Sequence, residues 1–147
     1  MVKKQSSAGI LIYFKENEEI KFLFLKYKTY WGFAKGIMEE NESEEQTAVR
    51  EAKEETNLDV TIIPGFKHEQ RWFFRFENNL IAKKAIFFIA KVSKEQSNEV
   101  KISEEHEAYS WLSLNEAEKV MKIKSNKEML RKAYDFILEY EKQKTLF

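Results

Sequence analysis

Short stretches in which apolar and polar residues alternate occupy the first part of the chain and predict β-strands. Residues 6–15 and 19–27 are two such stretches, and the polar segment between them is short enough for a hairpin turn. Residues 30–36 contain two glycines and predict a loop. Residues 58–63 form another apolar run, which ends at Pro64 and Gly65 and predicts a further strand.

The middle of the chain is rich in aromatic residues and predicts a second hairpin. Residues 69–76 and 83–92 carry aromatic and β-branched side chains, and a short strand is expected at residues 108–112. Alternation places the side chains of 71–76 on two opposite sides. We expect one of these sides to be core and the other, which carries two arginines, to face water or a polyphosphate. The two sets are Trp72, Phe74 and Phe76 on one side, and Arg71, Phe73 and Arg75 on the other.

Three segments carry the sequence signature of a helix start. Ser43, Ser113 and Ser125 each precede Gln or Glu by three positions, the spacing of a capping box. The first helix is expected to end near Asn57, because Asn tolerates the left-handed backbone found just past helices. The last helix is expected to bury a stripe at helical spacing, namely Leu130, Ala133, Ile137 and Tyr140. This order of elements predicts an α+β fold rather than a series of βαβ crossovers.

Composition narrows the class of protein. A chain of 147 residues with 43% hydrophobic and 14% aromatic content suits one packed domain over residues 1–147. The formal net charge of zero predicts no general polyanion-binding surface and no stable nucleic-acid partner, although it leaves a local basic patch open. The absence of cysteine excludes disulfides and thiolate chemistry and fits a cytoplasmic protein. No apolar run approaches the roughly 20 residues of a membrane span, so no membrane partner is expected. The oligomeric state is left open.

An unusually acidic helix carries the candidate chemistry. Glu51, Glu54 and Glu55 stand at positions i, i+3 and i+4, so they lie close together on one side of a helix. Like charges at this spacing cost a helix about 0.2–0.5 kcal/mol per pair, so a cation is expected beside them. Carboxylates suit Mg²⁺, Mn²⁺ or Ca²⁺, and Mg²⁺ usually joins carboxylates to substrate phosphates. The alternative is an acidic face that merely contacts water.

The segment from Gly36 to Leu58 resembles the signature of the Nudix hydrolases, Gly-x5-Glu-x7-Arg-Glu-U-x-Glu-Glu-x-Gly-U, where U is a bulky aliphatic residue. The matching positions are Gly36, Glu42, Arg50, Glu51, Ala52, Glu54, Glu55 and Leu58. Asn57 stands in place of the last glycine, and Ala52 is small for U. The resemblance implies a mixed β-sheet sandwiched between α-helices, and hydrolysis of a nucleoside diphosphate linked to another group.

The same resemblance implies roles for the acidic residues. Glu51 and Glu55 would be the main metal ligands, with Glu54 beside them, and Arg50 would hold the carboxylates in position. Mg²⁺ would be the cofactor, with Mn²⁺ as a substitute, and would assist the attack of water on phosphorus. Glu55 or Glu105, a glutamate in a later loop, would take the proton of that water. Glu105 would also join the metal site, so the implied catalytic set is Glu51, Glu55, Glu105 and Arg50.

Three further stretches are similar to the asymmetric diadenosine tetraphosphate hydrolases within this family. Residues 30–36 resemble their Trp-x-x-Pro-Lys-Gly segment, which implies that Lys35 binds the polyphosphate and that Tyr30 lies beside it. Residues 83–92 imply a phosphate contact for Lys83 and base stacking for Phe87, and "EHEAYSWL" implies the role of Glu105. His106 is expected to be exposed or to cap a turn. The implied reaction converts diadenosine tetraphosphate, a small-molecule substrate, to ATP and AMP.

Two other functions remain open at this point. The first is a Nudix pyrophosphohydrolase that acts on nucleoside triphosphates or RNA 5′ ends. The second is a non-catalytic Nudix module that binds a nucleotide, although such a protein would be expected to lack a motif glutamate.

Overall fold

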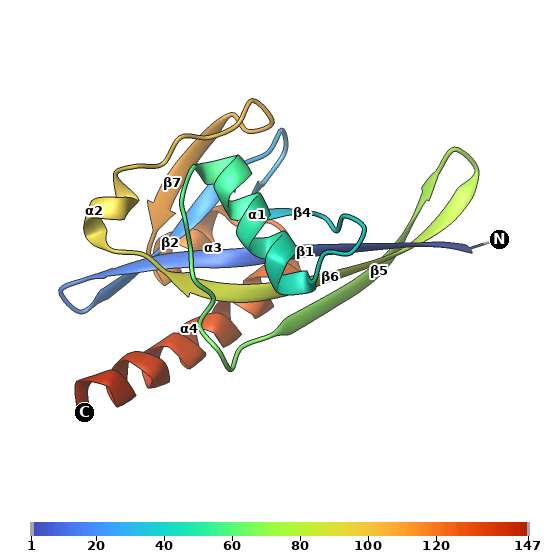
Figure 1. Cartoon of the computed structure of the whole chain (residues 1–147). Coiled ribbons are helices and arrows are strands. Elements are labelled where there is room, and N and C mark those ends of the chain that lie inside the picture. The colour runs from blue at the N-terminus through green and yellow to red at the C-terminus, as the bar shows by residue number, and fades with distance from the viewer. Residues whose placement is uncertain (1, 147) are drawn as a thin grey trace.

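The computed structural model describes residues 2–146 and contains a single mixed sheet with helices on both sides (Figure 1). The strands are β1 (Val2–Glu16), β2 (Glu19–Lys26), β3 (Trp31–Gly32), β4 (Ala34–Ile37), β5 (His68–Phe76), β6 (Asn79–Lys91) and β7 (Ala108–Leu112). The helices are α1 (Glu44–Thr56), α2 (Lys94–Ser97), α3 (Leu114–Val120) and α4 (Lys124–Leu146). Among the described residues, no helix is both long enough and apolar enough to cross a membrane.

The long strand β1 lies at the centre of the sheet. It pairs with β6 in parallel and with β2 and β4 antiparallel, which makes the sheet mixed. Residues Ser7 to Phe14 of β1 are buried on both faces, because helices cover both sides of the sheet there. On one side β1 therefore pairs with two strands: residues 7–10 pair with β4, and residues 13–16 pair with β2.

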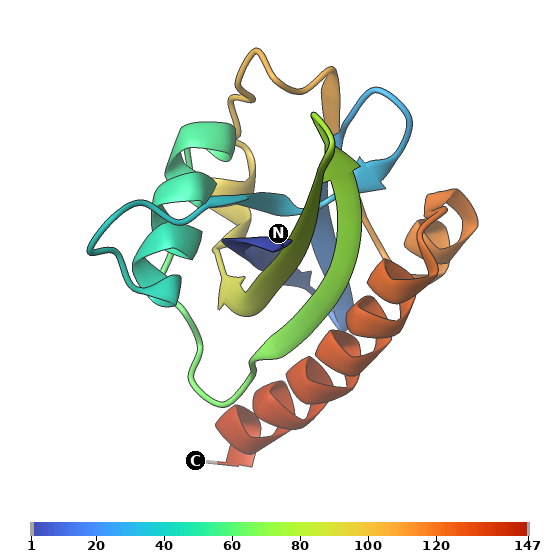
Figure 2. The same cartoon turned by 90° about the vertical axis from the view of Figure 1, so that its right-hand side faces the viewer.

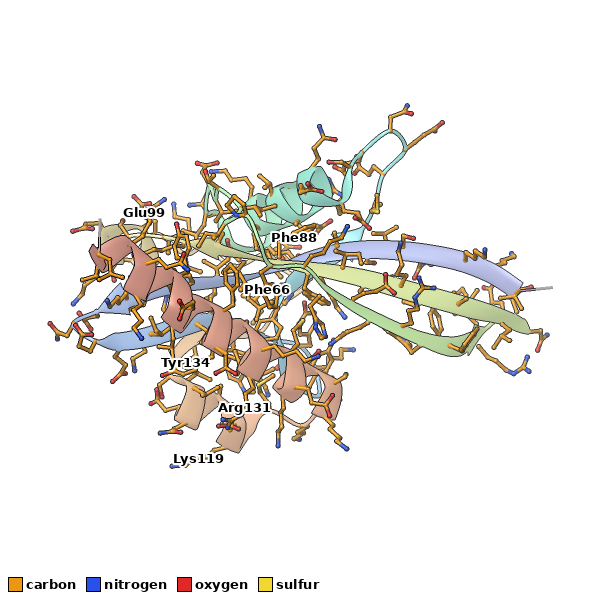
Figure 3. The ribbon with its side chains drawn as sticks, turned by 90° about the horizontal axis from the view of Figure 1, so that it is seen from below. Phe66, Phe88, Glu99, Lys119, Arg131 and Tyr134 are labelled. Carbon is orange, nitrogen blue, oxygen red and sulfur yellow. The ribbon has the colours of Figure 1, made fainter. Side chains whose placement is uncertain are left out.

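Each face of the sheet contributes to a separate core. Even-numbered residues of β1 such as Ile10 and Ile12 pack with α1, whereas Leu11 and Tyr13 pack with α4. Figure 2 shows α1 on one side of the sheet and α3 with α4 on the other. Figure 3 looks onto α4 and shows its Arg131 close to α3, where Arg131 makes two hydrogen bonds of 2.8 and 2.6 Å to Glu118. The predicted α+β class and the helix-covered mixed sheet are confirmed.

Helix boundaries agree with the predicted capping residues in two of three cases. Ser43 caps α1 in a full capping box with Gln46, and Asn57 ends the helix with a left-handed φ of 70°. Ser113 caps α3 in the same way with Glu116. The prediction at Ser125 is wrong, because α4 begins at Lys124 and already includes Ser125.

Other local predictions need correction. Residues 30–36 form the short strands β3 and β4 instead of a loop, because β2 and β1 supply backbone partners. Residues 58–63 do not form a strand, and only a single bridge joins Ile62 to Ala90. The predicted stripe of α4 is buried at Leu130, Ala133 and Ile137, while Tyr140 is only partly buried.

The β5–β6 hairpin departs most from prediction. Its loop consists only of Glu77 and Asn78, both with positive φ (49° and 64°), as a tight hairpin turn requires. Neither side of β5 is core from Arg71 to Phe76, because every side chain in this segment is exposed. Figure 1 shows the reason: the hairpin and the start of β1 extend beyond the helices that cover the rest of the sheet.

Candidate active site

Helix α1 places its acidic residues against β4. The helix buries Ala48 and Ala52 against the sheet, and this packing fixes which side of α1 faces β4. Glu55 is only 3% exposed although it is ionisable. The small size of Ala52, a departure from the Nudix signature, fits this close packing, since its side chain is fully buried.

Arg50 connects most of the acidic side chains of the segment. Its guanidinium donates to Glu42 at 2.7 Å, to Glu51 at 2.8 Å and to Glu54 at 3.1 Å. A further bond of 3.0 Å reaches the carbonyl of Ile37 at the end of β4. Arg50 therefore fixes the carboxylates of α1 relative to β4.

Glu51 lies directly against Gly36. A Cβ atom added at Gly36 would lie 2.1 Å from the carboxylate of Glu51, so any larger residue would displace this carboxylate. One residue earlier, the backbone N–H of Lys35 donates to Glu55 Oε2 at 3.0 Å. The backbone of β4 thus positions both Glu51 and Glu55.

A second acidic group approaches from the loop before β7. One ligand atom each from Glu55, Glu105 and His106 lies within 4.8 Å of the others. Burial, the neighbouring Glu51 carboxylate and, to a smaller extent, Glu105 raise the pKa of Glu55. A buried carboxylate crowded by like charges in this way has an electrostatic environment that favours a cation.

Lys35 also contributes to a cavity on the other side of β4. This cavity of about 570 Å³ is lined by Tyr30, Lys35 and Trp72, together with residues of β5 and the start of α4. The Lys35 ammonium lies 5.8 Å from the centre of the Trp72 ring, and Trp72 is 37% exposed. The residue that donates its backbone to the acidic cluster therefore extends its side chain into the cavity.

Lys83 belongs to the same cationic environment. Burial lowers the pKa of Lys83, and the charge of Lys35 lowers it further. Burial also lowers the pKa of Lys35 itself. Two partly buried lysines close enough to repel each other are suited to bind an anion with several negative oxygens, because the anion relieves the repulsion.

The family comparison decides the identity. The NUDIX domain model matches residues 3–133 of the chain. The chain belongs to the NUDIX domain family. The Nudix signature therefore coincides with the segment that the structure folds into β4, the following loop and α1.

Relatives within the family are similar over most of the chain. The asymmetrical bis(5′-nucleosyl)-tetraphosphatase of Sus scrofa is 37% identical over 128 residues, which cover 83% of this chain and 84% of that protein. A crystal structure of a C. elegans Ap4A hydrolase binary complex has a TM-score of 0.79 and 28% identity, and the alignment covers 92% of this chain and 98% of that one. The E. coli dihydroneopterin triphosphate pyrophosphohydrolase has a TM-score of 0.68 and 25% identity, with coverage of 87% and 94%. The protein is thus a Nudix hydrolase related to the Ap4A hydrolases.

The acidic residues of this Nudix site fit a divalent cation. Glu51, Glu55 and Glu105 offer hard oxygen ligands, and the raised pKa of Glu55 shows the crowding of negative charge that a cation would relieve. Glu54 is placed differently, because its side chain is 56% exposed and Arg50 binds it. The structure therefore places Glu51 and Glu105 each beside Glu55, and Glu54 at the edge of the cluster.

Phe87 does not occupy the position expected for base stacking. It is 2% exposed and packs in the core between the sheet and α4. Its ring lies edge-on to Phe33 and fills the space that a side chain at Gly9 would occupy. A buried ring offers no face to a base, so this expectation is corrected. Trp72 on the neighbouring strand β5 presents an exposed aromatic ring to the cavity instead.

The expected exposure of His106 is wrong, because the residue is buried, whereas the expected role in a turn agrees with the 3.2 Å hydrogen bond from its backbone N–H to the Ser103 carbonyl. Its Nε2 lies 3.0 Å from Glu55 Oε1, although the geometry does not meet that of a hydrogen bond, and its Nδ1 lies 3.2 Å from Ser103 Oγ. Burial lowers the pKa of His106 and favours the neutral imidazole. The position of His106 next to Glu105 in sequence was the only available signal, and it carried no information about burial.

Proposed function

We propose that the protein hydrolyses diadenosine tetraphosphate to ATP and AMP with the help of Mg²⁺. The observation that carries the proposal is the double contact of Lys35. Its backbone N–H holds Glu55 in the acidic cluster, while its side chain lines the cavity beside Trp72. A phosphate chain that binds Lys35 is therefore adjacent to the carboxylates. The similarity to asymmetrical bis(5′-nucleosyl)-tetraphosphatases supports this choice of substrate.

In the proposed complex, the lysines bind the phosphates and Trp72 binds one adenine. Lys35 supplies positive charge in the cavity, and Lys83 adds a second charge close enough for the two to repel each other. Stacking of a base on an aromatic ring contributes about 1–3 kcal/mol, and the exposed ring of Trp72 provides such a surface. Tyr30 lines the same cavity, and its ring stacks on Tyr27 at 4.7 Å, which fixes its orientation.

The acidic cluster in turn orients the reacting phosphate. Glu51, Glu55 and Glu105 would hold Mg²⁺, and Mn²⁺ would fit the same oxygen ligands. The bound ion would neutralise phosphate oxygens and lower the pKa of a water molecule. Arg50 keeps Glu51 in place through its 2.8 Å hydrogen bond. Water adds to a phosphorus atom, the bridging P–O bond breaks, and ATP and AMP leave.

A substrate panel tests this proposal. Purified protein is incubated in Mg²⁺ with diadenosine tetraphosphate, nucleoside triphosphates and 5′-triphosphorylated RNA, and the products are identified by chromatography. The proposal predicts ATP and AMP in equal amounts from diadenosine tetraphosphate, with a kcat/KM above that of the other substrates. ADP as the product, or faster hydrolysis of the triphosphates or RNA, would contradict it. No hydrolysis of any substrate would indicate a non-catalytic module.

A further inference from the structure

The hairpin end of the sheet forms a projection. Trp72 and Lys83 of this projection belong to the proposed substrate site and Arg71 also lines its cavity, whereas the other residues take no part in it. We call residues 2–6, 71–76 and 79–84 the ribbon. Figure 1 shows it extending past α1 and α4, and Figure 3 shows its side chains pointing away from both sides into open space. Phe73 and Phe76 on β5 are 66% and 62% exposed. Strands usually bury at least one face, so exposed aromatic residues on both sides indicate a binding surface.

Strand pairing assigns the residues of the ribbon to its two faces. Arg71 is paired with Lys84, and Phe73 with Ala82, which pairs in turn with Lys4. Directly paired residues share a face, so these side chains lie together on the side of the sheet that α1 covers further along. We call Lys4, Arg71, Phe73, Arg75 and Lys84 the basic face. Trp72 and Lys83 lie on the opposite face, where Trp72 lines the proposed substrate cavity.

The basic face contains a hollow of about 330 Å³. Its lining includes Lys4, Arg71, Phe73 and Lys84 of this face and the small residues Ser6 and Ala82, and it also reaches Gln5, Trp72 and Lys83 of the opposite face. Along β5, Arg71 and Arg75 stand on either side of Phe73, about 13 Å apart at the rise of an extended strand. An exposed ring between two cations is thus combined with further cations from β1 and β6.

Two of the four cations of this face, Lys4 and Arg75, are available to a ligand. Within residues 2–146, no carboxylate lies within 4.0 Å of the charged groups of Lys4 or Arg75. Lys84 has only a 3.8 Å contact with Glu44, and Arg71 is paired with Glu69. The zero net charge of the whole chain therefore conceals a local concentration of cations.

We propose that the basic face binds single-stranded nucleic acid, with phosphates on its Lys and Arg side chains and a base on Phe73. Cations interleaved with exposed aromatic rings are the features by which proteins bind single strands without sequence preference. A second copy of the chain is the competing occupant, because β5 is an edge strand. Antiparallel pairing of two β5 strands would bring the Arg71 and Arg75 charges of both copies together, and that repulsion favours a polyanion instead. This binding is separate from the proposed hydrolysis.

The test is fluorescence anisotropy of a labelled 12-nucleotide oligouridine, measured in EDTA so that no hydrolysis occurs. Phe73→Ala should weaken binding about tenfold or more. Phe76→Ala is the matched control, since Phe76 is a similarly exposed phenylalanine of β5 on the opposite face, and it should bind like wild type. Arg75→Gln should weaken binding and reduce the slope of log K against log salt by about 0.7. All three variants should hydrolyse diadenosine tetraphosphate at the wild-type rate.

Each contrary result has a distinct meaning. Equal losses in Phe73→Ala and Phe76→Ala, or no binding by the wild type, would overturn the proposal. Full competition by inorganic polyphosphate, with no effect of Phe73→Ala, would show that the face binds polyanions without a base contact. A wild-type dimer in light scattering that Phe73→Ala converts to a monomer would assign the face to self-association. Loss of hydrolysis in the substrate panel alone would leave the nucleic-acid proposal standing.

Discussion

The replacement of Gly36 by alanine tests the geometry of the acidic cluster with a single methyl group. The new Cβ would lie 2.1 Å from both Cδ and Oε1 of Glu51, whereas ordinary van der Waals contact begins at 3.4 Å. The carboxylate therefore has to move by about 1.3 Å. A misplacement of about 1 Å in a catalytic site can cost roughly 10²-fold in rate. We expect Gly36→Ala to reduce kcat for diadenosine tetraphosphate by about that factor.

Stability should change little in the same variant. Alanine restricts the unfolded chain and contributes about 0.4–1 kcal/mol to stability where its backbone conformation is unstrained. Gly36 has no positive φ, so this gain is expected, and it offsets the weakened bond between Arg50 and Glu51. Gly65→Ala is the control, because Gly65 has a φ of 106° and a Cβ there would face Phe136 of α4 rather than the acidic residues of α1. It should lower Tm and leave kcat unchanged.

The assay is product formation from diadenosine tetraphosphate in Mg²⁺, combined with thermal unfolding of wild type and both variants. The reasoning requires that Gly36→Ala loses activity without losing Tm, and that Gly65→Ala does the reverse. If Gly36→Ala keeps kcat within threefold of wild type, the position of Glu51 against β4 does not matter for turnover. The assignment of Glu51 to the catalytic cluster would then be refuted.

Three further predictions concern pH, base binding and the attachment of α4. Hydrogen bonds from Arg50 and Thr47 lower the pKa of Glu42 to about 2, so its contribution to stability is present above the unfolded pKa of about 4.3 and is lost as the pH falls towards 2. Glu42→Gln should therefore flatten the stability curve between these values in acid titrations, and an unchanged curve would contradict the assignment. Trp72→Ala should raise KM for diadenosine tetraphosphate about 5- to 150-fold while Trp72→Phe retains most of the affinity; an unchanged KM would exclude Trp72 as the stacking residue. Glu141→Ala should lower the free energy of unfolding in urea by about 3 kcal/mol. It removes the acceptor of two hydrogen bonds, from the buried Tyr13 hydroxyl at 2.6 Å and from Lys91 at 3.1 Å, whereas Glu139→Ala at an exposed position of the same helix should have little effect.

The sequence was sufficient to predict those helix ends that depend only on a few neighbouring residues. The capping box at Ser43 and the left-handed end at Asn57 depend on residues within one turn of α1, so both could be read directly from the chain. The failure at residues 58–63 has the opposite cause. That apolar run is buried through Leu58 and Ile63 but meets β6 only at the single bridge of Ile62 to Ala90, and hydrophobicity alone does not reveal how far two segments pair.

The site shows the same division between local and distant information. The spacing of Glu51 and Glu55 on one helix was predictable, because helix geometry fixes it. The burial of Phe87 depends on its pairing with Gly9, which leaves room for the ring, and this pairing joins distant strands. The contact of His106 with Glu55 likewise depends on how the loop before β7 folds over α1. Alternation and the two arginines were sufficient to predict that the side with Phe73 is exposed. The exposure of Trp72, Phe74 and Phe76 on the other side could not be predicted, because it depends on where the helices that cover the sheet end.

The central claim is that Glu51 and Glu55 jointly hold a divalent ion beside the phosphate-binding lysines. Titration with Mn²⁺, followed by the loss of the free-ion signal in electron paramagnetic resonance, tests it without reference to turnover. Wild type should bind at least one ion, and Glu51→Gln and Glu55→Gln should each weaken that binding about 100-fold or more, whereas Glu139→Gln on α4 should bind like wild type. Equal Mn²⁺ affinity in wild type, Glu51→Gln and Glu55→Gln would contradict the account.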